Sequence, residues 1–557
     1  EAGAGVSTNS HADNVGLGYR ALYGITTGAR NVAIGPNSPG LSITQGTDNV
    51  LIGNAVGDAM TTTTSTVIIG SGAGSAINST DADGTVAIGY NAADALTDGR
   101  YNTAIGYNAM SANSGSDKNT AFGYAALANM NGTDGETQNT AVGYYAGGGA
   151  MTGTENTIVG SIAGDAITSG VSNTLMGVMA GSAINSGGYN TIIGRRAGQA
   201  ITTGAYNTAL GSSALYTLST GTGAVAIGQG AGYKFTASGG VFIGYETGYN
   251  LASGDTVMIG YQAGKRLSAT GNVAIGYTAL YGASATAADN SGTSNTGIGN
   301  NALKWISKTI GSTAVGDGAG YYTTGSYNTF MGYGAGHGSV TSAPYSSGGS
   351  NVAIGKNALY NVSSGDYNIA IGEAAGDNIT SGEGNVTIGY NAGNVTTADY
   401  NTMIGHQAGQ TTSAAANVII GYRAAWHYGA GASNVIIGNL AAEAFMGQES
   451  VIIGHQAGYG LATADLTTSV IIGKNAGRYA KGARITTIGW NAGSYMSGSD
   501  NTFVGAYAGL GSQQSAPYGT GIHNTTLGSY SGYNLTSGNQ NILASKLVYQ
   551  PQLVLII

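Results

Sequence analysis

Hydrophobic and polar positions repeat along this chain with a period of about 17 residues. The recurring pattern is Asn-(Val/Thr)-apolar-Ile-Gly-Tyr-x-Ala-Gly, and 30 copies align on its first glycine between Gly18 and Gly528. We number each copy from that glycine, which is position zero. Helical repeats need roughly 33 residues or more, whereas about 17 residues suit one rung of two short strands and two turns. The pattern therefore predicts an all-β fold, a parallel β-solenoid (β-roll) of about 30 rungs.

The residues before position zero predict a strand with a buried face. Position −3 is Val, Thr or Ile and position −1 is apolar in all 30 copies. Both residue types favour a strand, and residues two apart point to the same side of it. We therefore expect positions −3 and −1 to line the lumen of the solenoid.

Position −2 then points outward, and it is also mostly apolar. A strand that is apolar on both faces is usually buried on both faces. We expect the position −2 face to pack against other copies of the chain, most simply as a homotrimeric fibre around a three-fold axis. A monomer with a mildly apolar face is the alternative. The candidate residues for the trimer face are Ala104, Ala121, Phe242, Ile436 and Phe503.

Three further positions predict details of the rung. The glycine at zero predicts a bend where a Cβ would clash, or a positive φ. Position +3 is Ala in 26 of 30 copies, which predicts a tight second wall of the lumen. Position −4 is Asn in 21 of 30 copies, and stacked asparagines can form a ladder of side-chain amide hydrogen bonds.

Aromatic residues are the best candidates for a binding function. Tyr occupies position +1 in 11 rungs, including the consecutive set from Tyr90 to Tyr144, and predicts a stacked ladder or a platform for sugar rings. Three longer rungs predict outward loops near 281–294, 339–350 and 510–523, and surface loops often carry binding function. The receptor-binding candidates are Trp305, Tyr345, Trp426, Trp490 and Tyr518.

Composition narrows the possible chemistry. The chain has no Cys, so neither disulfides nor cysteine metal sites are possible. Only 8% of its residues are charged and its net charge is −8, so the sequence offers no basic stripe for nucleic acid. It also has no run of 18 apolar residues, so we expect no membrane insertion. His406 and His455 share position +1 but stand three rungs apart, too far to share a metal within one chain. We expect no catalytic residues, no metal and no cofactor.

The repeat also sets the expected domain organisation. Residues 1–13 form a leading segment that could continue an upstream region, residues 14–545 form the solenoid, and residues 546–557 form an apolar C-terminal tail. The tail could be a terminal cap, an assembly contact or the result of a truncated sequence.

The repeats resemble those of known fibrous proteins. Segments such as Asn102 to Ala109 and Asn272 to Tyr277 resemble bacteriophage tail-fibre repeats, which are often followed by an intramolecular chaperone domain. The same pattern is similar to the head repeats of YadA-like trimeric autotransporter adhesins. The chain departs from both families at its end, where no chaperone, stalk or anchor pattern follows the repeats.

The resemblance implies a structural protein rather than an enzyme. We expect a viral tail-fibre shaft that presents or contributes to host-receptor binding, located on the virion or an extracellular surface. Its partners would be further copies of itself, other virion or fibre components, and a host-surface glycan or protein receptor. The alternatives are a bacterial cell-surface adhesin head and a subunit of an extracellular filament.

Overall fold

The protein was examined as a computed structural model of residues 1–557. The structure describes residues 12–131, 135–252, 254–283, 290–339, 346–394, 398–427, 431–444, 446–460, 466–511 and 519–544. They form a parallel β-solenoid of about 29 turns with a period of about 17 residues, which confirms the predicted fold class.

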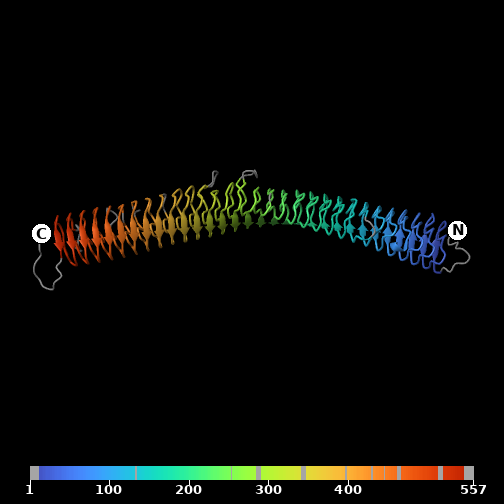
Figure 1. Ribbon diagram of the computed structural model, residues 1–557, viewed down its shortest axis with the longest axis horizontal. Coiled ribbons are helices and arrows are strands. Elements are labelled where there is room, and N and C mark those ends of the chain that lie inside the picture. The colour runs from blue at the N-terminus through green and yellow to red at the C-terminus, as the bar shows by residue number, and fades with distance from the viewer. Residues whose placement is uncertain are drawn as a thin grey trace. The chain divides into compact units, whose positions relative to one another are not determined.

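The chain divides into two compact units, Glu1–Asn272 and Val273–Ile557, and each is a stack of rungs built in the same way. Figure 1 shows the coils following one another in chain order, blue to green through the first unit and green to red through the second. The main ladder of the first unit consists of β1 (Val15–Leu17), β2 (Val32–Ile34), β3 (Val50–Ile52), β4 (Val67–Ile69), β5 (Val86–Ile88), β6 (Thr103–Ile105), β8 (Thr120–Phe122), β10 (Thr140–Val142), β11 (Thr157–Val159), β12 (Thr174–Met176), β13 (Thr191–Ile193), β14 (Thr208–Leu210), β15 (Val225–Ile227), β16 (Val241–Ile243) and β17 (Val257–Ile259).

The second unit repeats the arrangement over the described part of its chain. Its strands are β18 (Val273–Ile275), β19 (Thr296–Ile298), β20 (Thr313–Val315), β21 (Thr329–Met331), β22 (Val352–Ile354), β23 (Ile369–Ile371), β24 (Val386–Ile388), β25 (Thr402–Ile404), β26 (Val418–Ile420), β27 (Val435–Ile437), β28 (Val451–Ile453), β29 (Val470–Ile472), β30 (Thr486–Ile488), β31 (Thr502–Val504), β32 (Thr525–Leu527) and β33 (Ile542–Ala544). The predicted C-terminal tail, residues 546–557, lies outside the described residues.

Each strand covers positions −3 to −1 of its rung and pairs in parallel with the same positions of the next rung. Ala104 lies opposite Ala121, and Ile436 lies opposite Ile452. This register places equivalent residues directly above one another. Every position of the repeat therefore becomes a column of side chains that runs along its unit.

The inward and outward sides of the strand are the reverse of the sequence prediction. Position −2 is buried inside a single chain in all but the first and last strands, whereas positions −3 and −1 are half-buried or exposed on the outside. The candidates for the trimer face, Ala104, Ala121, Phe242, Ile436 and Phe503, are all 0% exposed. They belong to the core of the single chain, so their assignment to an interface between chains was wrong.

The prediction chose the wrong side because both sides of the strand are apolar. Alternation shows which residues share a side, but it does not show which side the chain folds over. After the strand, the rung turns back across position −2, where Ala at +3 and an apolar residue at +7 close the core. Ala163 at +3 and Ile167 at +7 show this on one rung, and both are fully buried.

The lumen is narrow and has three apolar columns. Position −2 supplies the first, and Ala at position +3 supplies the second, which confirms the predicted tight wall. Position +7 supplies a third column that the sequence reasoning did not single out, with Ile25, Ile167 and Phe235 among its fully buried members. The small alanine at +3 lets the two walls approach closely, while larger residues at +7, and at −2 in rungs such as those of Phe242 and Ile436, fill the remaining space.

The glycine at position zero is required by both conformation and space. Gly106 has φ +138°, and a Cβ placed on it would lie 2.3 Å from the carbonyl oxygen of Gly123 in the next rung. Side chains do not tolerate contacts that short. The predicted clash and positive φ are both confirmed, and they explain why this position is invariant across the copies.

The asparagines at position −4 form the predicted ladder. Asn156 Nδ2 donates to Asn139 Oδ1 at 3.0 Å and to the Gly170 carbonyl oxygen at 2.9 Å. Asn156 Oδ1 in turn accepts hydrogen bonds from the backbone N–H and the Nδ2 of Asn173. Asn139, Asn156 and Asn173 are at most 1% exposed, so the ladder satisfies polar groups that would otherwise be buried without partners.

Two smaller elements depart from the regular rung in the first unit. Strands β7 (Ser116–Asp117) and β9 (Gly135–Glu136) pair in parallel as a short side ladder. A 3-10 helix, η1 (Thr80–Ala82), starts after Ser79, whose side chain accepts a hydrogen bond from the Asp81 N–H. In the described part of the chain, no helix has the length and apolar character needed to cross a membrane.

Candidate functional site

The most extensive surface feature is the outer side of the strands, which we call the outer sheet face and define as positions −3 and −1 of every rung. Its members are Val, Thr or, in β23, Ile at −3 and mostly Ile at −1, and they are half-buried to exposed. Phe122 at 53%, Met176 at 45% and Met331 at 48% are among the most exposed. An apolar surface therefore follows each unit from rung to rung.

Charged residues are absent from this face in the whole sequence. The chain-wide share of 8% would place about five charges among its sixty positions, and there are none. A three-residue strand spans about 10 Å and strands lie about 4.8 Å apart, so the first unit alone presents roughly 700 Å² of uncharged surface, with Thr at −3 in seven of its fifteen strands. The largest apolar patch on an ordinary monomer is about 300–600 Å². The outer sheet face is therefore typical of a contact surface.

Columns of tyrosine flank this face at position +1 and position −5. Tyr107 stacks on Tyr90 with ring centroids 5.0 Å apart and on Tyr124 at 5.2 Å, which confirms the predicted ladder. On the other flank, Tyr189 and Tyr206 stack at 5.0 Å and are more than half exposed. The rings widen the apolar surface and keep their hydroxyl groups available to solvent.

The three predicted tryptophans lie in separate places on the second unit. Trp305 packs edge-on against Tyr281, with Lys304 Nζ 5.4 Å from its ring centre. Trp426 donates from Nε1 to Gln410 Oε1, and the Arg423 guanidinium carbon lies 4.0 Å from its ring centre. The structure therefore does not bring them into one site.

Trp490 is the most open of the three tryptophans, with 50% of its surface exposed. It continues the +1 column and lies 5.0 Å from Tyr507 at a tilted angle. The other two candidates, Tyr345 and Tyr518, lie outside the described residues.

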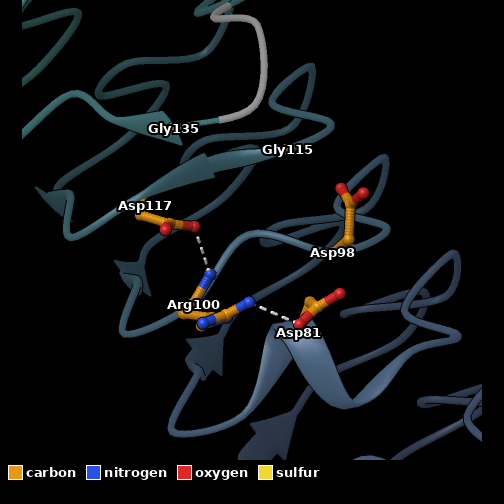
Figure 2. Close-up of a pocket in the computed structure, with 6 residues that line it drawn as sticks. All are labelled: Asp81, Asp98, Arg100, Gly115, Asp117 and Gly135. Carbon is orange, nitrogen blue, oxygen red and sulfur yellow. Dashed lines mark hydrogen bonds and ion pairs between the residues drawn. The ribbon is translucent and has the colours of Figure 1, made fainter.

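A cavity of about 370 Å³ lies beside the side ladder in the first unit. It is lined by Asp81, Asp98, Arg100, Gly115, Asp117 and Gly135. Arg100 Nη2 is 2.5 Å from Asp81 Oδ1, and the Arg100 backbone N–H donates to Asp117 Oδ1. Figure 2 shows the Asp98 carboxylate turned away from Arg100. Because Arg100 already pairs with two of the three acids and the pair is about half exposed, this cavity has little capacity to hold a cation.

A smaller cavity of about 140 Å³ lies on the second unit and combines aromatic with polar groups. Its lining residues are Asn301, Asp317, Gly318, Tyr321, Tyr333, Gly334, His337 and Tyr360. Tyr321, His337 and Tyr360 form one stack at position +5, with centroid distances of 5.2 and 4.5 Å. Burial lowers the pKa of His337, so its imidazole is neutral at physiological pH.

Sequence reasoning missed this cavity because none of its residues is unusual alone. The available signal was two glycines at position +2 in successive rungs, Gly318 and Gly334. Among the residues that the structure describes, no three His, Asp or Glu side chains are close enough to hold a metal ion.

No protein-family model matches this chain, and no curated protein matches it significantly.

Proposed function

We propose that this chain is the shaft of a homotrimeric extracellular fibre, of the kind that virus tail fibres form, and that it presents or contributes to host-receptor binding. The observation that supports assembly is the outer sheet face, which has no charge in any rung and an apolar residue at −1 in every rung, while the other surfaces carry all the charged residues. Burial of such a face between chains removes apolar surface from water.

A second copy of this chain is the partner that fits the face best. The side chains on it recur at the strand spacing of about 4.8 Å, so only a partner with the same repeat can interlock with it over many rungs. Three copies around one axis bury all three faces in a closed, symmetric arrangement. The resemblance to tail-fibre and trimeric adhesin repeats supports three copies over two.

Residues on the outside of the fibre would then remain available for a receptor, either a glycan or a protein on the host surface. The flanking tyrosines and the exposed Trp490 supply amphipathic rings suited to such contacts. The ends of the shaft would connect to other virion components. The resemblance of the repeats is what supports a virion location over other extracellular surfaces.

The mass of the full chain in solution tests the assembly. One chain has a mass of 55.1 kDa, so light scattering should give about three times that value. Ile404→Glu combined with Ile437→Glu places charges on the outer sheet face two rungs apart and should yield monomers. The matched control, Ser381→Glu with Ser413→Glu, adds the same charge to exposed turns and should leave the trimer intact.

A monomeric wild-type chain with a normal β-sheet circular dichroism spectrum would reject the assembly. A dimer would retain the outer sheet face as the interface but reject the three-fold arrangement.

A further inference from the structure

Side chains at position +2 normally fill the strip of surface between the +1 and +5 columns. Glu246 at +2 accepts hydrogen bonds from Gln262 at +2 of the next rung, at 2.8 Å, and from Lys265 at +5, at 2.6 Å. Arg423 at +2 likewise lies over both Tyr422 at +1 and Trp426 at +5. These bridges leave little open space between the columns.

The strip is open where two successive rungs have glycine at position +2, namely Gly318 and Gly334. No other two successive copies in the sequence both have Gly there. The result is the cavity of about 140 Å³ described above, with the two glycines as its floor. That volume is well below the roughly 300–1,000 Å³ of pockets for drug-sized ligands, and it suits one small ring.

The two walls of the cavity differ in character. The +1 wall consists of Asp317 and Tyr333, both exposed, and Tyr333 is 60% exposed. Unlike most other +1 tyrosines, Tyr333 stacks on no ring in the described part of the chain, so no neighbouring aromatic ring covers its face. The +5 wall is the half-buried stack of Tyr321, His337 and Tyr360.

Polar atoms with unused hydrogen-bonding capacity surround this space. The Asp317 carboxylate has no ion-pair or hydrogen-bond partner among the described side chains. Asn301 Oδ1 accepts from Thr278 Oγ1 at 2.6 Å, which leaves the Asn301 Nδ2 group free to donate. His337 Nδ1 lies 3.1 Å from the Gly338 carbonyl oxygen, so Nδ1 of the neutral ring carries the proton and Nε2 is an acceptor.

We propose that this cavity, the Tyr333 hollow, binds the six-membered ring of a neutral sugar. An open aromatic face packs against the C–H groups of a sugar ring, while a carboxylate and an amide fix its hydroxyl groups. The single carboxylate in the lining, Asp317, disfavours acidic sugars by charge repulsion. The inference rests on the proposed role in receptor binding and names the glycan ring that one part of the fibre would hold.

Saturation-transfer NMR of the full-length chain with free glucose, galactose and N-acetylglucosamine tests the proposal. At least one sugar should show transfer with a Kd on the order of 1 mM, as expected for a single ring in a shallow site. Gly318→Gln should abolish the transfer because its side chain fills the hollow. The variant should fold, because Gln407 occupies the same position with φ 56° and a Cβ on Gly318 meets nothing closer than 3.7 Å.

Gly230→Gln is the matched control, since Gly230 also lies at position +2 with φ +64° but far along the sequence from the hollow. It should bind sugar as the wild type does, whereas Tyr333→Ala should lose at least tenfold in affinity. No transfer from any of the three sugars, or transfer that survives Gly318→Gln, would overturn the proposal. Equal binding of glucuronic acid and glucose would overturn the role of Asp317 in disfavouring acidic sugars.

The mass of each variant separates this proposal from the fibre assembly. A trimer that binds no sugar would reject the hollow alone. A monomer that binds sugar would reject the assembly alone.

Discussion

The two sides of each three-residue strand have similar sequences but opposite environments. On β27, Ile436 is completely buried in the lumen, and the next residue, Ile437, lies half-exposed on the outer sheet face. The inner side is closed by the chain itself through Ala at +3 and the apolar residue at +7. The outer side is equally free of charge, yet nothing in the single chain covers it. An apolar composition on both sides therefore indicates one core within the chain and, under the proposed function, one contact surface between chains.

The largest expected effect comes from a charge on each side of β27. Ile436→Glu buries an unpaired carboxylate and should cost more than about 4 kcal/mol of local stability, enough to unfold the neighbouring rungs. Ile437→Glu should change that stability by less than about 1 kcal/mol, because the side chain reaches water. Hydrogen exchange of the backbone amides around β27, measured under conditions where both variants are monomeric, gives the two values. Similar losses of protection in the two variants would contradict the assignment of the two sides.

A smaller effect should follow from breaking the asparagine ladder on the inner side. Asn156→Ala removes the hydrogen bonds to Asn139, Gly170 and Asn173 and leaves buried groups unpaired, which should cost about 2–4 kcal/mol. Asn156→Ser should cost less. The chain itself uses serine at this position in another rung, where Ser312 Oγ accepts a hydrogen bond from the Asn328 N–H at 3.1 Å.

Urea unfolding followed by circular dichroism measures both asparagine variants. Equal stability of the alanine and serine variants would show that side-chain volume, rather than hydrogen bonding, determines what the ladder tolerates.

The smallest expected effect concerns Asp377, whose side chain is partly buried. Burial raises the pKa of this carboxyl, and Asp377 Oδ1 has no hydrogen-bond partner in the described structure. The folded state therefore binds a proton more readily than the unfolded state, so Asp377 destabilises the fold at pH 7 and less so as the pH falls through its raised pKa. Asp377→Asn should stabilise the chain at pH 7 by less than about 1 kcal/mol, a small value because the residue is only partly buried.

Thermal unfolding of Asp377→Asn at pH 7 and pH 4 tests this expectation, and the gain should shrink at the lower pH. Glu383→Gln removes the same charge from an exposed turn and should have no comparable effect. A gain for Asp377→Asn that is the same at both pH values would refute the role of ionisation.

The repeat and its local chemistry could be predicted from the sequence because they depend on residue type and spacing. Val, Thr and Ile before an invariant glycine predicted the strands, Asn at −4 predicted the ladder, and Ala at +3 predicted a close wall. The Tyr90 to Tyr144 stack followed from the parallel register alone, since equivalent residues of successive rungs lie above one another. Trp305, Trp426 and Trp490 were identified as surface aromatics, but their positions relative to one another depend on rung position, which residue type does not reveal.

Only the tertiary structure decided which side of the strand is inside. Alternation assigns Ile436 and Ile437 to opposite sides, but both are apolar, so hydrophobicity could not distinguish core from surface. The turn after the strand decides it, because left-handed residues at +2 and +4, such as Asn108 and Met110, direct the chain back over position −2. The Tyr333 hollow likewise exists only in three dimensions. It forms because Gly318 and Gly334, which have no side chains, lie one above the other in the +2 column and leave space between the +1 and +5 columns.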